Sequence, residues 1–208
     1  MSYTVKEIFL TLQGEGMQAG RRAVFLRFAG CNLWNGREKD RAAADCAFCD
    51  TDFVGTDGVD GGRYDAEGLA DRVESLWGAS ERRLVVVTGG EPLLQLDAAL
   101  IGALHARGFA IAVETNGTLP APAGIDWLCV SPKAGTKVVQ RSGDELKLVW
   151  PQQGIEPADL AGWDFDHFLI QPMDGAGARA ALDASIAFVM ANPGWKLGLQ
   201  THKLIGLP

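Results

Sequence analysis

The sequence predicts an α/β fold: a shortened, open parallel (β/α) barrel of about six strands and three helices. The first observation is that short apolar segments alternate with amphipathic ones, as expected for strands buried on both faces and separated by helices. The second is that only three segments are good helices. A complete eight-unit barrel takes about 250 residues, and this chain has 208. An open, doubly wound sheet is the alternative.

Each element is expected at a definite place. Strands are expected at residues 23–28, 83–88, 110–115, 127–131, 146–150, 168–172 and 196–200, and helices at residues 66–77, 96–107 and 179–191. Asp65 is placed to cap the first helix, and Gly108 is placed to end the second. Residues 51–65 are rich in Gly and Asp and are expected to form a flexible loop. One domain is expected over residues 1–208, with a cysteine-bearing loop at residues 30–50.

Composition excludes several classes of function. The formal net charge is −7 and the 19 Lys and Arg residues do not cluster, whereas nucleic-acid binders usually carry a basic stripe. We therefore expect a small-molecule substrate and no nucleic-acid partner. The chain has no apolar run of membrane-spanning length and its N-terminus lacks the pattern of a signal peptide, so we expect no membrane association and a cytoplasmic location.

Glycines and polar residues follow the predicted strands. These segments are GGEP (89–92), ETNG (114–117), SPK (131–133), QPMD (171–174) and QTHK (200–203). In parallel α/β folds the carboxyl ends of the strands form the active site. The alternative is that loops are polar in any protein. The paired glycines of GGEP favour a site, because they permit a close approach of the backbone.

Three of the four cysteines lie in the pattern C-x14-C-x2-C, at Cys31, Cys46 and Cys49. Thiolates at such spacing hold zinc or an iron–sulfur cluster. Three interpretations stay open: structural zinc, a three-cysteine cluster with one iron free for chemistry, and metal-free thiols. Zinc needs a fourth ligand. Cys129 lies in an apolar strand, and among the histidines only His202 is near the predicted mouth.

A set of motifs covers almost the whole chain. They are TLQGEG (11–16), FLRFAGCNLW (25–34), CDTDF (49–53), VTGGEPLLQ (87–95), ETNGT (114–118), SPK (131–133), QPMD (171–174) and QTHKLIGLP (200–208). Together they resemble the 7-carboxy-7-deazaguanine synthase family of the radical S-adenosylmethionine (SAM) superfamily. The usual superfamily spacing is C-x3-C-x2-C, so the first gap is eleven residues longer here.

The resemblance implies a barrel of the radical SAM type and two bound groups. Cys31, Cys46 and Cys49 would hold a [4Fe-4S] cluster whose open iron binds SAM, and an electron from the cluster would release a 5′-deoxyadenosyl radical. The residues implied for SAM are Phe48, Asp50, Gly90, Glu91, Ser131, Pro132, Lys133, Gln171, Pro172, Met173 and Asp174. For Phe48, burial in the core is the alternative.

The implied substrate is 6-carboxy-5,6,7,8-tetrahydropterin. Its implied contacts are Leu12, Gln13, Gly14, Glu15, Arg27, Thr88, Glu114, His202 and the terminal Pro208. Arg27 suits the substrate carboxylate because a guanidinium binds carboxylates bidentately, unless strand alternation turns it outward. Glu114 and His202 could instead be structural. Thr51 would offer its hydroxyl to a Mg²⁺ ion, which takes few protein ligands, although it could also cap a turn.

The implied reaction is a radical ring contraction to 7-carboxy-7-deazaguanine with loss of ammonia and regeneration of SAM, in 7-deazapurine (queuosine) biosynthesis. The enzyme would be a carbon–nitrogen lyase. The resemblance also implies a homodimer and a flavodoxin or ferredoxin-type electron donor. Two alternatives are kept: an activating enzyme that makes a glycyl radical on a protein partner, and a zinc-stabilised binding module.

Overall fold

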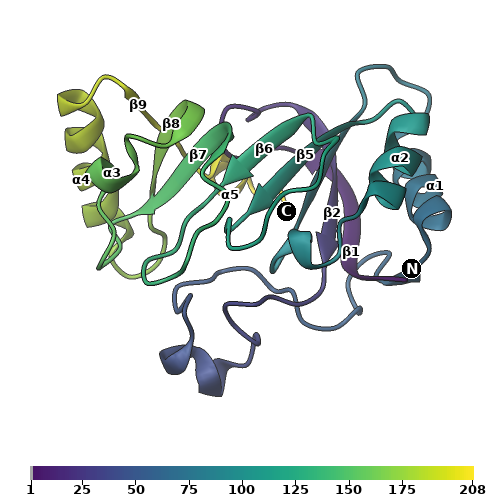
Figure 1. Ribbon diagram of the computed structural model, residues 1–208, viewed down its shortest axis with the longest axis horizontal. Coiled ribbons are helices and arrows are strands. Elements are labelled where there is room, and N and C mark those ends of the chain that lie inside the picture. Colours follow the sequence, from purple (N-terminus) through teal and green to yellow (C-terminus); the bar gives the residue numbers. More distant parts are fainter. Residues whose placement is uncertain (1) are drawn as a thin grey trace.

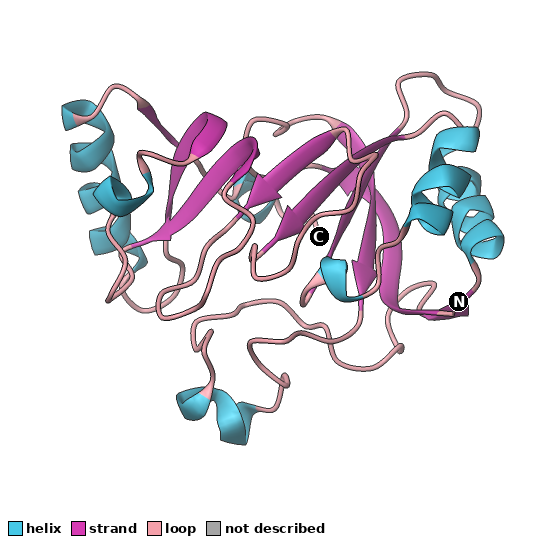
Figure 2. Ribbon diagram, viewed as in Figure 1, coloured by secondary structure: helices cyan, strands magenta, loops and turns pink. Residues whose placement is uncertain are grey.

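Nine strands form one sheet in the order β3-β1-β2-β4-β5-β6-β7-β8-β9 (Figures 1 and 2). The computed structural model describes residues 2–208. The strands are β1 (Tyr3–Leu12), β2 (Arg22–Phe28), β3 (Gly62–Tyr64), β4 (Leu84–Gly89), β5 (Ala110–Thr115), β6 (Trp127–Val130), β7 (Ser142–Trp150), β8 (Asp164–Pro172) and β9 (Trp195–Leu197). The helices are α1 (Ala66–Trp77), α2 (Ala98–Ala106), α3 (Pro157–Leu160), α4 (Ala178–Ala191) and α5 (Thr201–Ile205), with two 3₁₀ segments, η1 (Glu38–Ala43) and η2 (Pro92–Leu94).

In the order of the sheet, the six neighbouring pairs from β2–β4 to β8–β9 are all parallel, which confirms the predicted open parallel (β/α) sheet. All seven expected strands and all three expected helices are present. Two further strands were not predicted: β1 and β3 pair antiparallel along one edge. A register shift between Val5 and Glu7 breaks the alternation of β1, so its sequence lacks the period of two that identifies strands.

Long helices cover only the two ends of the sheet. Figure 1 shows α1 and α2 over the β1–β4 end and α4 over the β8–β9 end. The connections around β6, residues 116–126 and 131–141, contain no helix. The barrel is shortened and open because only three long helices pack against its seven parallel strands. No helix within residues 2–208 is long and apolar enough to cross a bilayer.

The residues predicted to begin the first helix and to end the second do so in the structure. The carboxylate of Asp65 accepts a hydrogen bond from the backbone N–H of Gly68 and caps α1. Gly108 has φ +74 and follows the end of α2, as expected for a glycine that terminates a helix. Val85 and Val87 of β4 pack toward the helices in the main core. The other face of the sheet is therefore left for the site.

Candidate active site

The inner face of the sheet is apolar at one end of the strands and polar at the other. Because side chains alternate along a strand, residues two apart share a face. Ala23, Leu84, Val86 and Ala112 form a small buried apolar cluster on this face. Continuing along the same strands by steps of two leads to polar residues near the carboxyl ends: Arg27 on β2, Thr88 on β4 and Glu114 on β5.

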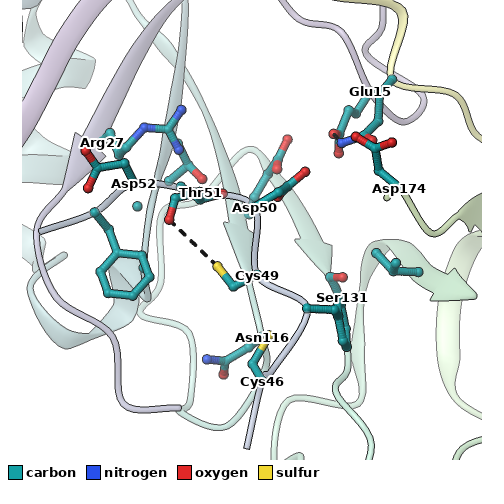
Figure 3. Close-up of a pocket in the computed structure, with 18 of the residues that line it drawn as sticks. Glu15, Arg27, Cys46, Cys49, Asp50, Thr51, Asp52, Asn116, Ser131 and Asp174 are labelled. Atoms are coloured by element: carbon teal, nitrogen blue, oxygen red, sulfur yellow. Dashed lines mark hydrogen bonds between the residues drawn. The ribbon is translucent and has the colours of Figure 1, made fainter. Parts of the chain in front are cut away.

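These polar residues line a cavity of about 750 Å³. Its wall is completed by the cysteine loop and by the C-terminal segment, so residues from both ends of the chain meet there (Figure 3). The structure brings together the expected residues Leu12, Gln13, Gly14, Glu15, Arg27, Cys31, Cys46, Phe48, Cys49, Asp50, Thr51, Thr88, Gly90, Glu114, Ser131, Lys133, Gln171, Pro172, Met173, Asp174, His202 and Pro208.

Two expected residues do not line the cavity, Glu91 and Pro132. The Glu91 side chain is fully buried. Its carboxylate accepts hydrogen bonds from the Thr115 hydroxyl at 2.7 Å, the Asn116 backbone N–H at 2.8 Å and the Leu93 backbone N–H at 2.9 Å. Its side chain therefore joins the end of β4 to the end of β5, and the expected contact of Glu91 with SAM stays a prediction.

Pro132 helps to fix the course of the main chain after β6 instead of lining the cavity. Its carbonyl oxygen lies 3.4 Å from Nε2 of the buried Gln152, and Oε1 of Gln152 accepts from the Ala134 backbone N–H at 3.1 Å. The two contacts hold the segment after β6 in place. Pro132 therefore supports its neighbours Ser131 and Lys133, which do line the cavity.

Gly90 must be a glycine because the backbone passes very close to the cysteine loop. A Cβ atom built there would lie 2.3 Å from the carbonyl oxygen of Gly30 and 2.6 Å from Cβ of Cys31. The backbone N–H of Glu91 donates to that same Gly30 carbonyl at 3.0 Å. GGEP therefore supports the first cysteine through its main chain, as the paired glycines indicated.

Cys31, Cys46 and Cys49 are free thiols that line one part of the cavity. A hydrogen bond with Cys46 is the main cause that lowers the pKa of Cys49 to about 6, and the thiolate is the form that binds metals. Within residues 2–208, no three His, Cys, Asp or Glu side chains surround a point that could hold a single ion. Cys129, expected in the core, is buried and contacts Glu145.

The long insert between the first two cysteines supplies a support that sequence reasoning missed. Arg41 of η1 donates from Nη1 to the carbonyl oxygens of Ala47 and Cys49, at 3.1 and 2.8 Å. Its guanidinium lies 4.1 Å from the centre of the Trp34 ring, and Glu38 accepts from its Nε at 2.9 Å. Arg41 therefore ties the segment after Cys31 to the C-x2-C segment.

The C-terminal segment closes another wall. Thr201 donates to the carbonyl oxygen of Gly14 from both its backbone N–H and its hydroxyl, at 2.8 and 2.9 Å. A Cβ atom on Gly14 would lie 2.1 Å from Nδ1 of His202. Lys203 donates to Asp50 at 2.7 Å and to Asp174 at 2.6 Å. The segment thus contacts the β1 end, the cysteine loop and the β8 end.

A buried charge network occupies the wall formed by β1, β5 and β7. Lys147 donates to Glu15 at 2.5 Å and to Glu114 at 3.3 Å. Gln13 donates to Glu114 at 2.8 Å, and Gln200 donates to Glu15 at 2.8 Å. Sequence reasoning missed Lys147. The available signal was its position between Leu146 and Leu148, which are buried on the helix-covered face.

Comparison with known proteins identifies the family. A family model described as the radical SAM superfamily matches residues 40–145. 7-Carboxy-7-deazaguanine synthases from Caulobacter vibrioides and Bordetella pertussis are 63% and 60% identical to this chain, each over the full length of both proteins. The crystal structure of QueE from Escherichia coli matches with a TM-score of 0.75 and 28% identity, over 97% of this chain and 95% of that one. The chain belongs to the 7-carboxy-7-deazaguanine synthase family.

As a member of the 7-carboxy-7-deazaguanine synthase family, the chain is a radical SAM enzyme. The two alternative functions, a glycyl-radical activating enzyme and a zinc-stabilised binding module, are therefore rejected. The family implies a [4Fe-4S] cluster and SAM, and the side chains fit both. A zinc ion would need four close ligands, which this loop does not assemble around one point. A cluster instead takes thiolates spread around a larger core.

Two side chains that line the cavity, those of Gln171 and Lys133, are suited to binding SAM. Oε1 of the buried Gln171 has no hydrogen-bond partner within residues 2–208 and lies on a side chain that lines the cavity, so a donor from a ligand would satisfy it. Lys133 lines the cavity beside Phe48 and donates to Ser131 at 2.7 Å. Its charge is available for an anionic group such as a carboxylate.

Proposed function

We propose that the chain catalyses the ring contraction of 6-carboxy-5,6,7,8-tetrahydropterin to 7-carboxy-7-deazaguanine and ammonia, the step into 7-deazapurine (queuosine) biosynthesis. The atoms balance without an external oxidant, since product and ammonia together contain the atoms of the substrate. The observation that carries the proposal is one cavity that joins three thiols to Arg27 and to the paired carboxylates Glu15 and Glu114.

The cysteines would hold the [4Fe-4S] cluster, which supplies the electron that cleaves SAM and so starts the radical chemistry. SAM itself would lie against Phe48, Asp50, Gly90, Ser131, Lys133 and the QPMD segment. Lys133 and Gln171 would fix its polar ends. Glu91 would hold the β4 and β5 ends in place, because its carboxylate accepts from Thr115, Asn116 and Leu93.

Arg27 would bind the substrate carboxylate. Its Nε donates to Glu7 at 2.8 Å, and within residues 2–208 its two terminal nitrogens have no recorded acceptor. A guanidinium fixed at Nε presents those nitrogens for bidentate binding. The hydroxyl of Thr51, which also lines the cavity, would contribute to a Mg²⁺ site beside the substrate. His202 and the end of the chain at Pro208 would complete this wall.

The carboxylates Glu15 and Glu114 would accept hydrogen bonds from the N–H groups of the pterin ring, with Leu12, Gln13, Gly14 and Thr88 beside it. Outside the cavity, we propose a flavodoxin or ferredoxin-type electron donor and a homodimer, both on the strength of the family. One domain spanning residues 1–208 is part of the same proposal, supported by the single sheet that runs from β1 to β9.

The proposal is tested by anaerobic reconstitution. The protein is loaded with iron and sulfide and incubated with SAM, a reductant and carboxytetrahydropterin, and the products are analysed by mass spectrometry. We expect 7-carboxy-7-deazaguanine from the wild type and none from Cys31→Ala. Cleavage of SAM without a deazapurine product would contradict the assigned substrate, and failure to assemble any cluster would contradict the assigned chemistry. Omission and re-addition of Mg²⁺ tests the Thr51 site.

A further inference from the structure

We infer that Lys147 is the positioning residue that makes the cavity selective for a heterocycle with a 2-amino–N3–H edge, by holding Glu15 and Glu114 as a pair of ionised hydrogen-bond acceptors. The inference rests on the proposed function and goes beyond it, because it assigns ring selectivity to a residue that the motifs do not include. Lys147 lies on β7, outside every motif that carries the family resemblance.

The contacts of Lys147 are those of a residue that acts through others. Its side chain is only 5% exposed, while those of Glu15 and Glu114 are 16% and 23% exposed. Nζ is 2.5 Å from Oε2 of Glu15 and 3.3 Å from Oε2 of Glu114. All three side chains line the cavity, and that of Lys147 is the least exposed of them, so a ligand would meet mainly the carboxylate oxygens.

Each carboxylate keeps acceptor capacity for a ligand. Glu15 accepts from Lys147 and Gln200, and Glu114 accepts from Lys147 and Gln13. A carboxylate has about four lone-pair sites, so each retains about two, and both side chains line the cavity. Two such groups side by side match a ring edge that presents adjacent N–H donors. They disfavour an edge that presents a carbonyl oxygen at the same place.

Arg27 and the pair Glu15 and Glu114 lie at different places along the cavity, which would set the direction of the ring. Figure 3 shows Arg27 and Glu15 on opposite sides of the pocket, with Thr51 and Asp50 between them in this view and Cys46 and Cys49 below. A substrate carboxylate bound by Arg27 leaves the other end of the bicyclic ring pointing toward Glu15 and Glu114. In a pterin that end carries the 2-amino group and N3–H.

Lys147 is needed because the carboxylates are buried together. Glu145, which accepts from the Met17 backbone N–H at 2.9 Å, adds a third carboxylate near Lys147. Burial acts to raise the pKa of Glu15, but the charge and hydrogen bond of Lys147 outweigh it and the pKa is lowered to about 2. Without the ammonium, the carboxylates of Glu15 and Glu114 repel each other at close range and lose the donor that fixes their oxygens.

The test compares Lys147→Met with Arg107→Met in the reconstituted holoenzyme. Arg107 is a matched control because it also pairs with neighbouring carboxylates, those of Glu67, Asp71 and Glu74, but on the outer helix α1. KM for carboxytetrahydropterin, kcat and substrate-independent SAM cleavage are measured. Binding of 6-carboxypterin is compared with 6-carboxylumazine, in which an oxo group replaces the 2-amino group. Lys147→Met/Glu15→Gln removes one buried charge of each sign and serves as a second, less strained variant.

We expect Lys147→Met to raise KM by about tenfold to a hundredfold, the effect of losing one charge-assisted hydrogen bond. SAM cleavage without substrate and kcat should stay near wild type, and the preference for carboxypterin over carboxylumazine should fall by a similar factor. The double variant should show the same loss of preference. A folded variant of either kind with wild-type KM and preference overturns the inference while the wild type still makes product. A wild type that makes no deazapurine overturns the proposed function instead.

Discussion

Some residues shape this site by contacting other residues and not by facing the cavity. Glu91 shows this most clearly. A glutamate after two glycines at a strand end is expected to meet a ligand, yet its carboxylate is occupied by three donors from η2 and β5. Asn116 is one of these donors through its backbone N–H. Its side-chain Nδ2 also donates to Asn32 at 3.0 Å, and Asn32 is next to Cys31.

Because Gly14 has no side chain, the two ends of the chain can pack closely together at this point. In Gly14→Ala the new Cβ would lie 2.1 Å from Nδ1 of His202, so the C-terminal segment must move. We expect kcat/KM to fall by about tenfold to a hundredfold, as for other displacements near one ångström. Steady-state kinetics measure this. Gly102→Ala is the control, because nothing lies within 4 Å of its Cβ position on α2, and it should keep full activity.

The pKa of Glu15 predicts a pH-dependent contribution to stability. Burial acts to raise this pKa and Lys147 and Gln200 lower it, with a net value of about 2 against an ordinary 4.5. A carboxylate whose pKa is lowered by folding stabilises the native state above its unfolded pKa and loses that contribution as pH falls toward its folded pKa. The difference in unfolding free energy between wild type and Glu15→Gln should therefore be constant above about pH 5 and shrink between about pH 4.5 and pH 2.

Urea denaturation of the cluster-free protein at several pH values measures this difference. Glu67→Gln is the comparison, since Glu67 is largely exposed at the outer helices and surface ion pairs contribute little. A Glu15 difference that stays constant down to pH 3 would contradict the predicted coupling to Lys147.

Among the elements, the insert of the cysteine loop is the one whose role the spacing alone does not explain. The gap of fourteen residues contains the short 3₁₀ segment η1, formed by six of them, Glu38–Ala43. The consequence of that helix was not predictable, because it depends on Arg41 reaching back to the carbonyls of Ala47 and Cys49. Such contacts depend on how the loop folds in three dimensions, and no periodic pattern in the sequence predicts them.

Removing Arg41 should loosen the cluster. In Arg41→Ala the carbonyls of Ala47 and Cys49 lose their donor and the Trp34 ring loses its cation. We expect less iron per protein after reconstitution and a faster loss of the visible absorbance in air, with the fold retained. Arg37→Ala, which changes an exposed arginine just before η1, should behave as wild type. Equal cluster lifetimes in the two variants would count against a supporting role for Arg41.

At the scale of the whole molecule, the sequence predicted the parallel sheet, because β2 and β4 to β9 are apolar runs with clear turn signals between them. The edge strand β1 was missed because of its register shift, and β3 because it has only three residues within a Gly-rich loop. The cavity residues at strand ends could be predicted from the motifs. Lys203 lies in the QTHK motif and Lys147 between two buried leucines, but their roles could not be predicted, since each acts through partners more than 25 residues away in the chain.

Lys203 connects three parts of the molecule, because it joins α5 to Asp50 in the cysteine loop and to Asp174 after β8. It is partly exposed, so its ion pairs are screened by salt. We expect Lys203→Met to raise KM for SAM by at most about fivefold. The wild-type KM should rise with ionic strength and approach that of the variant. Lys196→Met, at an exposed lysine on β9, should leave both KM and its salt dependence unchanged.

The contact between Gly14 and Thr201 joins residues 187 positions apart in the chain. Contacts between such distant residues carry a large entropy cost of loop closure and tend to form late in folding. The sheet from β1 to β8 can assemble before that contact exists. We therefore expect a folding order in which the cysteine loop is already in place while the cavity is still open on the side of α5. Iron and sulfide delivered at that stage would reach the three thiols directly, and the arrival of the last residues would then close the loaded site.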